Sequence, residues 1–257
     1  MAATEGHDLP ATIRRVPVDA SGRWLAAAWM DVRRAPGLSF GYGAGFVVTS
    51  FALSVGLFAF DLGSLVLPLA GGFVLLAPFL VVGFYEISRR LERNEAPSAG
   101  PVARACCAQM GQIGAMGVVL MLVFLVWALL AAILFALFYG HNPPPLDRFA
   151  EEILFSLRGA AFLAVGTAVG AIIATGIFFI SAFSFPMLID RPVDVFTAMA
   201  VSIRAVRANW RVMFGWAALI VVLTAVGVLT LFLGLAVVMP LLGYATWHAY
   251  RDVIVPH

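Results

Sequence analysis

The sequence predicts an all-α membrane protein: a polytopic transmembrane helical bundle of six spans with three interfacial amphipathic helices. Hydrophobic residues make up 62% of the 257 residues and charged residues 12%, whereas soluble proteins average roughly 45–50% and about 25%. A soluble fold could not hide so much apolar surface behind so few charges. Long charge-free stretches and an uneven distribution of arginine between them are the other two observations that predict this fold.

The spans follow from the charge-free stretches, because a transmembrane helix needs roughly 20 consecutive apolar residues. Five such stretches are present: Ala35–Phe60, Leu62–Tyr85, Ala105–Leu146, Gly159–Ile189 and Val212–Tyr250. As one helix, the last stretch would be about 58 Å long, twice the hydrocarbon thickness. We therefore expect two helices there, with a turn near Leu233 and Gly234. The predicted spans are 37–59, 65–86, 115–139, 159–185, 212–232 and 235–250.

The sixth span is the least regular of the set, because it is short and contains Pro240. A re-entrant or tilted helix is the alternative for this segment, and it would give five spans plus a half-membrane hairpin.

Arginine placement tests the six-span count independently. All 16 basic residues are arginine, a usage that indicates a GC-rich bacterial genome. If residue 1 is cytoplasmic, only Arg148 and Arg158 fall in outer loops, and the other 14 arginines fall in inner segments. Positive residues concentrate on the cytoplasmic side of membrane proteins. The count therefore predicts an inner-membrane protein with both termini in the cytoplasm, and the polar start broken by Pro10 and Pro17 does not resemble a secretory signal peptide.

Shorter segments of helical periodicity precede three of the spans. We expect interfacial helices over 21–35, 101–112 and 192–210, after a polar tail over 1–20 and within a single membrane domain over 21–257. Pro78 precedes Arg89 by 11 residues, and Pro240 precedes Arg251 by the same distance. These spacings predict three copies of a unit made of an amphipathic helix and a hairpin, with a divergent middle copy.

The third interfacial segment carries the candidate lipid site. Apolar residues recur there every three or four positions, while Arg204, Arg207 and Arg211 lie on another face. This pattern is typical of a helix in the headgroup region whose arginines reach phosphates. The alternative is that these arginines only keep the loop in the cytoplasm.

Two stripes of glycine are candidate helix-packing sites, because small residues four apart let transmembrane helices approach closely. They are Gly37, Gly41 and Gly45 in the first span, and Gly166 and Gly170 in the fourth. The sequence leaves open whether they pack within one chain or between chains.

Residues that would support redox, metal or catalytic chemistry are scarce. The histidines are His7, His141, His248 and His257, and no two of them are placed to hold one haem. Of these, only His248 lies near a helix, at the interface, where anchoring by neighbouring aromatics is the simpler interpretation. Cys106 and Cys107 are adjacent, which disfavours a disulfide; we expect free thiols, with a redox or metal site as the alternative.

Charged groups are absent from the predicted membrane cores, whereas ion-coupled transporters place them at membrane depth. Glu86 is expected to form an interfacial ion pair with Arg89 or Arg90. The segment 37–41 matches GxSxG, but that motif needs a preceding strand, and Ser39 enters a predicted transmembrane helix. A net charge of +2 without a basic stripe argues against nucleic-acid binding.

Four segments carry a family resemblance: Trp24–Ser39, Gly72–Glu92, Phe185–Trp210 and Met239–Asp252. Through them the chain resembles a bacterial integral membrane family of unknown function, domain of unknown function 2189. The resemblance implies a multi-span inner-membrane protein and no established activity. Members are sometimes labelled putative cytochrome c oxidase subunits; the histidines exclude a catalytic oxidase subunit here and leave a cofactor-free accessory subunit open.

The expected function is that of a non-enzymatic scaffold or accessory subunit, without cofactor or metal, that binds anionic lipids and protein partners in a complex or a homo-oligomer. The alternative is a transporter or channel for a small neutral or lipid-like substrate. A continuous polar cavity at the membrane midplane, lined by the first, fourth and fifth spans, would favour transport.

Overall fold

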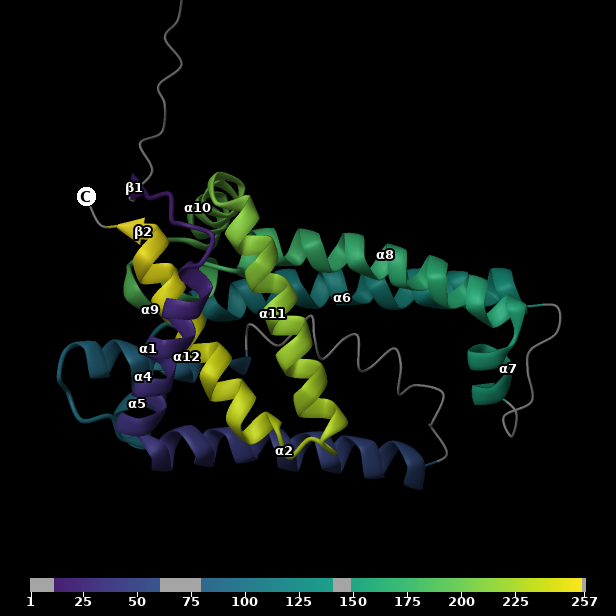
Figure 1. Cartoon of the computed structure of the whole chain (residues 1–257), viewed down its shortest axis with the longest axis horizontal. Helices are drawn as coiled ribbons and strands as arrows, with labels where there is room; N and C mark the ends of the chain where they lie inside the picture. Colours follow the sequence, from purple (N-terminus) through teal and green to yellow (C-terminus); the bar gives the residue numbers. More distant parts are fainter. Residues whose placement is uncertain (1–11, 61–79, 141–148, 256–257) are drawn as a thin grey trace, which may run out of the picture.

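The computed structural model describes residues 12–60, 80–140 and 149–255 (Figure 1). Over these residues the fold is all-α, as the sequence predicts, apart from one short pair of strands. The elements are β1 (Thr12–Ile13), α1 (Ala20–Arg34), α2 (Pro36–Ala59), α4 (Val82–Glu92), α5 (Ala99–Ala108), α6 (Met110–Tyr139), α7 (Phe149–Phe155), α8 (Leu157–Ser181), α9 (Ser184–Asp190), α10 (Val195–Ala208), α11 (Trp210–Leu229), α12 (Leu235–Val253) and β2 (Ile254–Val255).

Four segments of the described chain are long and apolar enough to cross a membrane. They are Pro36–Leu57, Met110–Tyr139, Leu157–Asp190 and Trp210–Leu229. They coincide with the first, third, fourth and fifth predicted spans, so a multi-pass protein is found. The second predicted span, 65–86, lies mostly outside the described residues, and the total of six stays a prediction.

The sixth predicted span is a helix, but its surroundings differ from those expected of a lipid-facing span. Twelve of the 19 residues of α12 are buried, and the helix packs against α1, α2, α4 and α11. It is not among the four apolar candidates; its last turns carry His248, Arg251 and Asp252. Pro240 lies inside the continuous helix.

The turn between α11 and α12 lies where the sequence predicts it. Leu231 and Phe232 adopt positive φ angles of 53° and 66°, a region that costs a residue with a side chain roughly 1–2 kcal/mol. Thr230 stabilises the turn, because its hydroxyl donates to the Gly227 carbonyl and accepts from the Gly234 N–H, both at 2.9 Å.

Three short helices meet longer ones at single-residue joints. Ala35 separates α1 from α2, Gln109 separates α5 from α6, and Asn209 separates α10 from α11. The short helices lie within three residues of the predicted ranges 21–35 and 192–210, whereas α5 ends at Ala108, four residues before the predicted end at 112. Thr197 donates two hydrogen bonds to the Asp194 side chain at the start of α10, and these bonds lower the pKa of Asp194.

The long axis of the molecule follows its most apolar helices. α6 and α8 run side by side along it, and α2 extends in a similar direction below them (Figure 1). α10 is seen nearly end-on in the same view, so it lies across the direction of α6 and α8. α1, α4, α5, α9 and α12 gather at one end of this axis, which we call the charged end because of the side chains described below.

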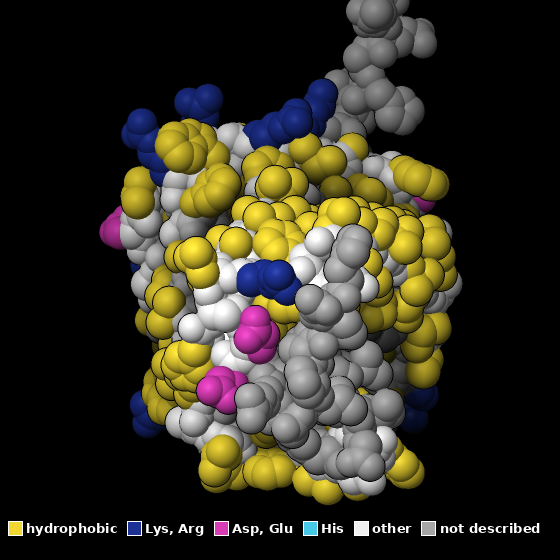
Figure 2. All heavy atoms as spheres, turned by 90° about the vertical axis from the view of Figure 1, so that its right-hand side faces the viewer, with side chains coloured by type: hydrophobic (Ala, Val, Ile, Leu, Met, Phe, Trp, Pro, Cys, Tyr) yellow, Lys and Arg dark blue, Asp and Glu magenta, His cyan; other side chains and the backbone are white. Residues whose placement is uncertain are grey.

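The opposite end is covered mostly by apolar side chains. Figure 2 views the molecule from this end, where yellow hydrophobic atoms surround a small group of charged ones. Leu154, Phe155 and Leu157, at the junction of α7 and α8, are exposed. This distribution suits contact with lipid or with apolar protein surfaces.

The segment predicted as a polar tail, 1–20, is docked over its described part. β1 pairs in antiparallel fashion with β2, so that Thr12 lies opposite Val255. The Val16 N–H donates to the Asn209 side chain at 2.9 Å. Residues from the start and the end of the chain therefore meet at the charged end.

Candidate functional site

The charged end holds a network of buried and half-buried ionic groups. Its acids are Asp31, Glu86, Glu92, Asp190 and Asp252, and we call these residues and their partners the ionic network. Buried charges are costly unless they are paired and hydrogen-bonded. Each acid of the network does have cationic or hydrogen-bonding partners, most of them from another helix.

Asp31 is the centre of the first group, between α1, α4 and α12. Its carboxylate is buried and accepts the Ser88 hydroxyl proton, while His248 Nε2 lies 2.8 Å from Asp31 Oδ2. Ser88 and His248 each contact the acid rather than one another. Asp31 is therefore a shared hydrogen-bond acceptor that joins α4 and α12 to α1.

Glu86 is the centre of the second group and is fully buried. Arg89 and Arg90 each donate to it from the same helix, both through Nε at 2.7 Å. The predicted ion pair is therefore confirmed, with both arginines taking part. Arg90 also reaches Glu95 at 3.2 Å, which compensates this second carboxylate.

Glu92 and Asp190 connect α12 to α4 and α9. Glu92 accepts the indole N–H of Trp247 at 3.0 Å, and Asp190 accepts the hydroxyl proton of Tyr250 at 2.8 Å. Arg251 lies between the two acids, 3.3 Å from Glu92 and 3.5 Å from Asp190. One cation thus joins the last turns of three helices.

Asp252 secures the described start of the chain. Arg14 forms an ion pair with it, Arg23 lies 3.3 Å away, and the Trp24 indole N–H donates to it at 3.0 Å. The aromatic core lies beside these charges: Trp24 meets Trp216 edge to face at 5.8 Å. Such aromatic pairs contribute about 0.5–1.5 kcal/mol beyond area burial.

Arg204, Arg207 and Arg211, the predicted lipid-headgroup residues, are exposed. Within the described ranges, none of the three forms an ion pair with an acidic residue. The Arg211 guanidinium lies over the Trp210 ring, 5.3 Å from its centroid. They are separate from the ionic network, and their charges are available to other molecules.

The predicted glycine stripes have two different environments. A Cβ atom built on Gly37, Gly41, Gly45 or Gly166 would have no described atom within 4 Å, whereas one built on Gly170 would lie 3.3 Å from the Trp127 ring. The first stripe is thus open within the described chain.

The closest glycine contacts occur at positions that the stripes do not include. A Cβ on Gly43 would overlap the backbone carbonyl of Ala236, and one on Gly243 would lie 2.7 Å from Phe84. α2 and α4 therefore approach α12 through these two glycines. Gly43 lies on the other side of α2 from the stripe, so the four-residue spacing did not reveal it.

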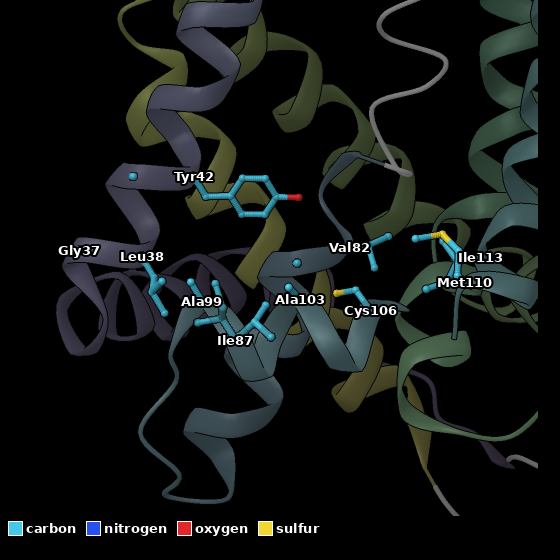
Figure 3. Close-up of a pocket in the computed structure, with 13 residues that line it drawn as sticks. Gly37, Leu38, Tyr42, Val82, Ile87, Ala99, Ala103, Cys106, Met110 and Ile113 are labelled. Carbon is cyan, nitrogen blue, oxygen red and sulfur yellow. The ribbon is translucent and has the colours of Figure 1, made fainter. Parts of the chain in front are cut away.

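Two cavities adjoin this end of the protein. The first, about 570 Å³, is lined by residues of α2, α4, α5 and α6, and Figure 3 shows Tyr42, Val82, Cys106 and Ile113 around it. The second, about 600 Å³, lies at the joint of α1 and α2 and reaches the segment after α4. None of the described residues lining either cavity comes from α8 or α11.

The two cysteines differ in their surroundings. Cys106 lines the first cavity and is partly buried, while Cys107 is exposed. Burial raises the pKa of the Cys106 thiol to about 11, and the negative charges of Glu86 and Cys107 add to the effect, against which Arg89 acts. Cys106 is therefore a neutral thiol at neutral pH. Among the described residues, no three metal-ligating side chains come together.

Ser39 lies in the first turn of α2, so the strand that a nucleophile elbow needs is not present before it. Its hydroxyl bonds the Ala35 carbonyl at 2.7 Å and the Tyr244 hydroxyl at 2.8 Å. The GxSxG match is a coincidence of small residues at a helix joint.

Comparison with known proteins supports the membrane assignment. A family model described as "Predicted integral membrane protein (DUF2189)" matches residues 66–190. This range includes all of the quoted segment Gly72–Glu92 and the first six residues of Phe185–Trp210. Trp24–Ser39 and Met239–Asp252 lie outside it. No curated protein and no solved structure matches the chain. With four apolar helices long enough to cross a bilayer, the chain is a multi-pass integral membrane protein, and its residues 66–190 match the predicted integral membrane protein family DUF2189.

Proposed function

We propose that this protein is a non-enzymatic component of the bacterial inner membrane that acts as a scaffold or accessory subunit. It binds anionic lipid headgroups through Arg204, Arg207 and Arg211 and contacts protein partners, or further copies of itself, within the bilayer. Both termini face the cytoplasm.

The observation that carries the proposal is the state of the three arginines. They are exposed and have no ion pair within the described chain, while the acids of the ionic network are engaged elsewhere. Arginine binds phosphate through parallel charge-assisted hydrogen bonds. Because α10 lies across the direction of α6 and α8 (Figure 1), it would lie along the membrane surface if those two helices span the bilayer.

The inner-membrane orientation is supported by where the charges gather. Arg14, Arg23, Arg90 and Arg251 all take part in the ionic network at one end of the long axis. The described start and end of the chain also pair there. By the positive-inside rule, this end faces the cytoplasm.

Partner contact is supported by the exposure of the apolar helices. In α6 and in the α8–α9 segment, only 6% of the most apolar 18-residue stretch is buried within the protein. The open glycine stripe of α2 adds a surface that permits close helix approach. Lipid covers such surfaces in a monomer, and a second membrane protein covers part of them in a complex.

The proposed threefold repeat is supported by the three short-to-long joints at Ala35, Gln109 and Asn209. It is also supported by contacts among α4, α9 and α12. These three helices overlap or follow the second predicted span of each pair. Each of these three helices contacts the other two.

The test is native mass spectrometry of the full chain released from a phosphatidylglycerol and phosphatidylcholine mixture. Replacing Arg204, Arg207 and Arg211 together by Gln should reduce retained phosphatidylglycerol severalfold. The matched Arg→Lys triple variant, which keeps the charge, should lose less. Equal retention by wild type and the Gln variant would overturn the lipid contact of Arg204 and Arg207 in α10 and of Arg211 in the first turn of α11.

A further inference from the structure

The joint between α1 and α2 has an apolar cavity on one side and, on the other, a cavity of mixed lining that includes Arg34, Asn94 and Glu95. The two cavities share Gly37 and Leu38, the first residues after Pro36 in α2. Their volumes of about 570 and 600 Å³ lie within the range of roughly 300–1,000 Å³ that is usual for small-molecule sites. They therefore form adjoining spaces of contrasting chemistry.

The first cavity is apolar. The charged residues of the ionic network do not line it, and its polar side chains are those of Tyr42 and Cys106. Tyr42 already donates its hydroxyl proton to the Leu80 carbonyl at 2.7 Å. Figure 3 shows Leu38 and Ile87 toward one end of the lining and Met110 and Ile113 toward the other. Such walls favour a hydrocarbon chain, because burying apolar surface is favourable in proportion to its area.

The second cavity has a positive rim. Arg34, Asn94 and Glu95 line it. Glu95 is compensated by Arg90 at 3.2 Å, whereas Arg34 is exposed and forms no ion pair with any residue of the described ranges. The rim therefore offers one uncompensated cation, and the positive end of the α2 dipole adds to it.

The position of the pair suits one kind of molecule. α1 ends with Arg33 and Arg34, and α2 begins a candidate membrane span at Pro36. The joint therefore lies at the change from charged to apolar sequence, where a phospholipid also changes from headgroup to acyl chain. The apolar cavity matches the acyl chain of a phospholipid, and the cationic rim beside it matches the anionic headgroup.

We propose that the two cavities bind one anionic phospholipid, with an acyl chain between α2, α4, α5 and α6 and the phosphate beside Arg34. The site shares with the proposed function the claim that this chain binds anionic lipid, but it uses different residues. It gives the open stripe of Gly37 and Gly41 a role: these glycines leave room for the chain of a lipid.

Two substitutions separate the chain from the headgroup. Gly41→Phe places a ring where a Cβ atom meets no atom of the described residues within 4 Å, so it should fill the apolar cavity. Its control is Gly45→Phe, in equally open space one turn further along α2 but outside both linings. Arg34→Gln removes the cation, and Arg33→Gln is the neighbouring control.

The experiment counts lipids that survive delipidation in native mass spectrometry of the full chain, with phosphatidylglycerol and phosphatidylcholine as probes. Wild type and both controls should retain one tightly held phosphatidylglycerol. Gly41→Phe should lose it, with about a tenfold drop in occupancy, and Arg34→Gln should lose the preference for phosphatidylglycerol over phosphatidylcholine. Unchanged occupancy in Gly41→Phe, or unchanged preference in Arg34→Gln, would overturn the proposal.

A second measurement does not depend on the folding of a variant. Phosphatidylglycerol with a photoactivatable group on its acyl chain should label wild-type peptides from residues 37–42 or 99–113. Labelling found only in other peptides would reject a phospholipid in this site. Equal labelling of the same peptides by a free fatty acid or an apolar peptide would also reject it. The triple Gln variant of Arg204, Arg207 and Arg211 tells the two sites apart. Loss of surface lipid with the cavity lipid retained supports both proposals, and unchanged surface lipid overturns only the contact of these three arginines in α10 and α11.

Discussion

His248 Nε2 lies 2.8 Å from Asp31 Oδ2, and this contact joins α12 to α1 across 217 positions of sequence. The same carboxylate holds Ser88 of α4. Asp31 therefore joins three helices at the charged end. Ser88 is fully buried, so its hydroxyl cannot turn to water when Asp31 is removed.

We predict that Asp31→Ala destabilises the protein by about 2–3 kcal/mol, since two polar partners lose their bond in a buried site. Thermal unfolding in detergent, followed by tryptophan fluorescence, measures this as a drop of several degrees in Tm. Asp19→Ala is the control: Asp19 is exposed at the start of α1 and makes no side-chain cap. Equal Tm values for the two variants would contradict the role of Asp31.

We predict that Glu86→Gln destabilises the protein by about 3 kcal/mol, because it leaves Arg89 and Arg90 close together without their shared carboxylate. Glu95→Gln removes a more exposed partner of Arg90, and exposed pairs contribute about 0–1 kcal/mol. The same unfolding assay compares the two. A larger effect at Glu95 than at Glu86 would be inconsistent with this network.

The two cysteines should react at different rates. A thiol with a pKa raised to about 11 has about one molecule in a thousand as the reactive thiolate at pH 8. Iodoacetamide should therefore label exposed Cys107 first and Cys106 far more slowly, and labelling of Cys106 should rise steadily between pH 8 and pH 10. Peptide mass spectrometry of partly labelled protein distinguishes the sites, and faster labelling of Cys106 would show that it is not buried.

Two glycines two residues apart should respond oppositely to the same change. Gly43→Ala forces a methyl group against the Ala236 carbonyl, and overpacking costs about 1–3 kcal/mol. The methyl group of Gly45→Ala meets none of the described atoms within 4 Å. This variant should be neutral or stabilising by up to about 1 kcal/mol, because alanine favours helix over glycine. Tm measurements on both variants check this, and a stable Gly43→Ala variant would rule out close contact of α2 with α12.

The spacing of apolar residues predicts the individual helices well, because helix formation depends mainly on residues that are close in sequence. A helix predicted over 192–210 is found as α10 over Val195–Ala208, since apolar residues three and four positions apart need one buried face. The turn before Leu235 was predicted from length alone, because one helix could not fit the bilayer.

Long-range pairing could not be predicted in the same way. Hydropathy marks α12 as a weak span, but it is buried because Trp247 and Tyr250 find acids on α4 and α9. Nothing in the local sequence of Glu92 or Asp190 identifies those partners. Glu86 is the exception, because its arginines lie three and four residues away on one helix.

The burial of α12 has a consequence for biosynthesis. The faces of α1, α2 and α4 that it covers are made long before it, so Asp31 and Glu92 stay without their α12 partners, His248 and Trp247, while more than a hundred further residues are added. The charged end therefore closes only after α12 has been made and has docked on these earlier helices.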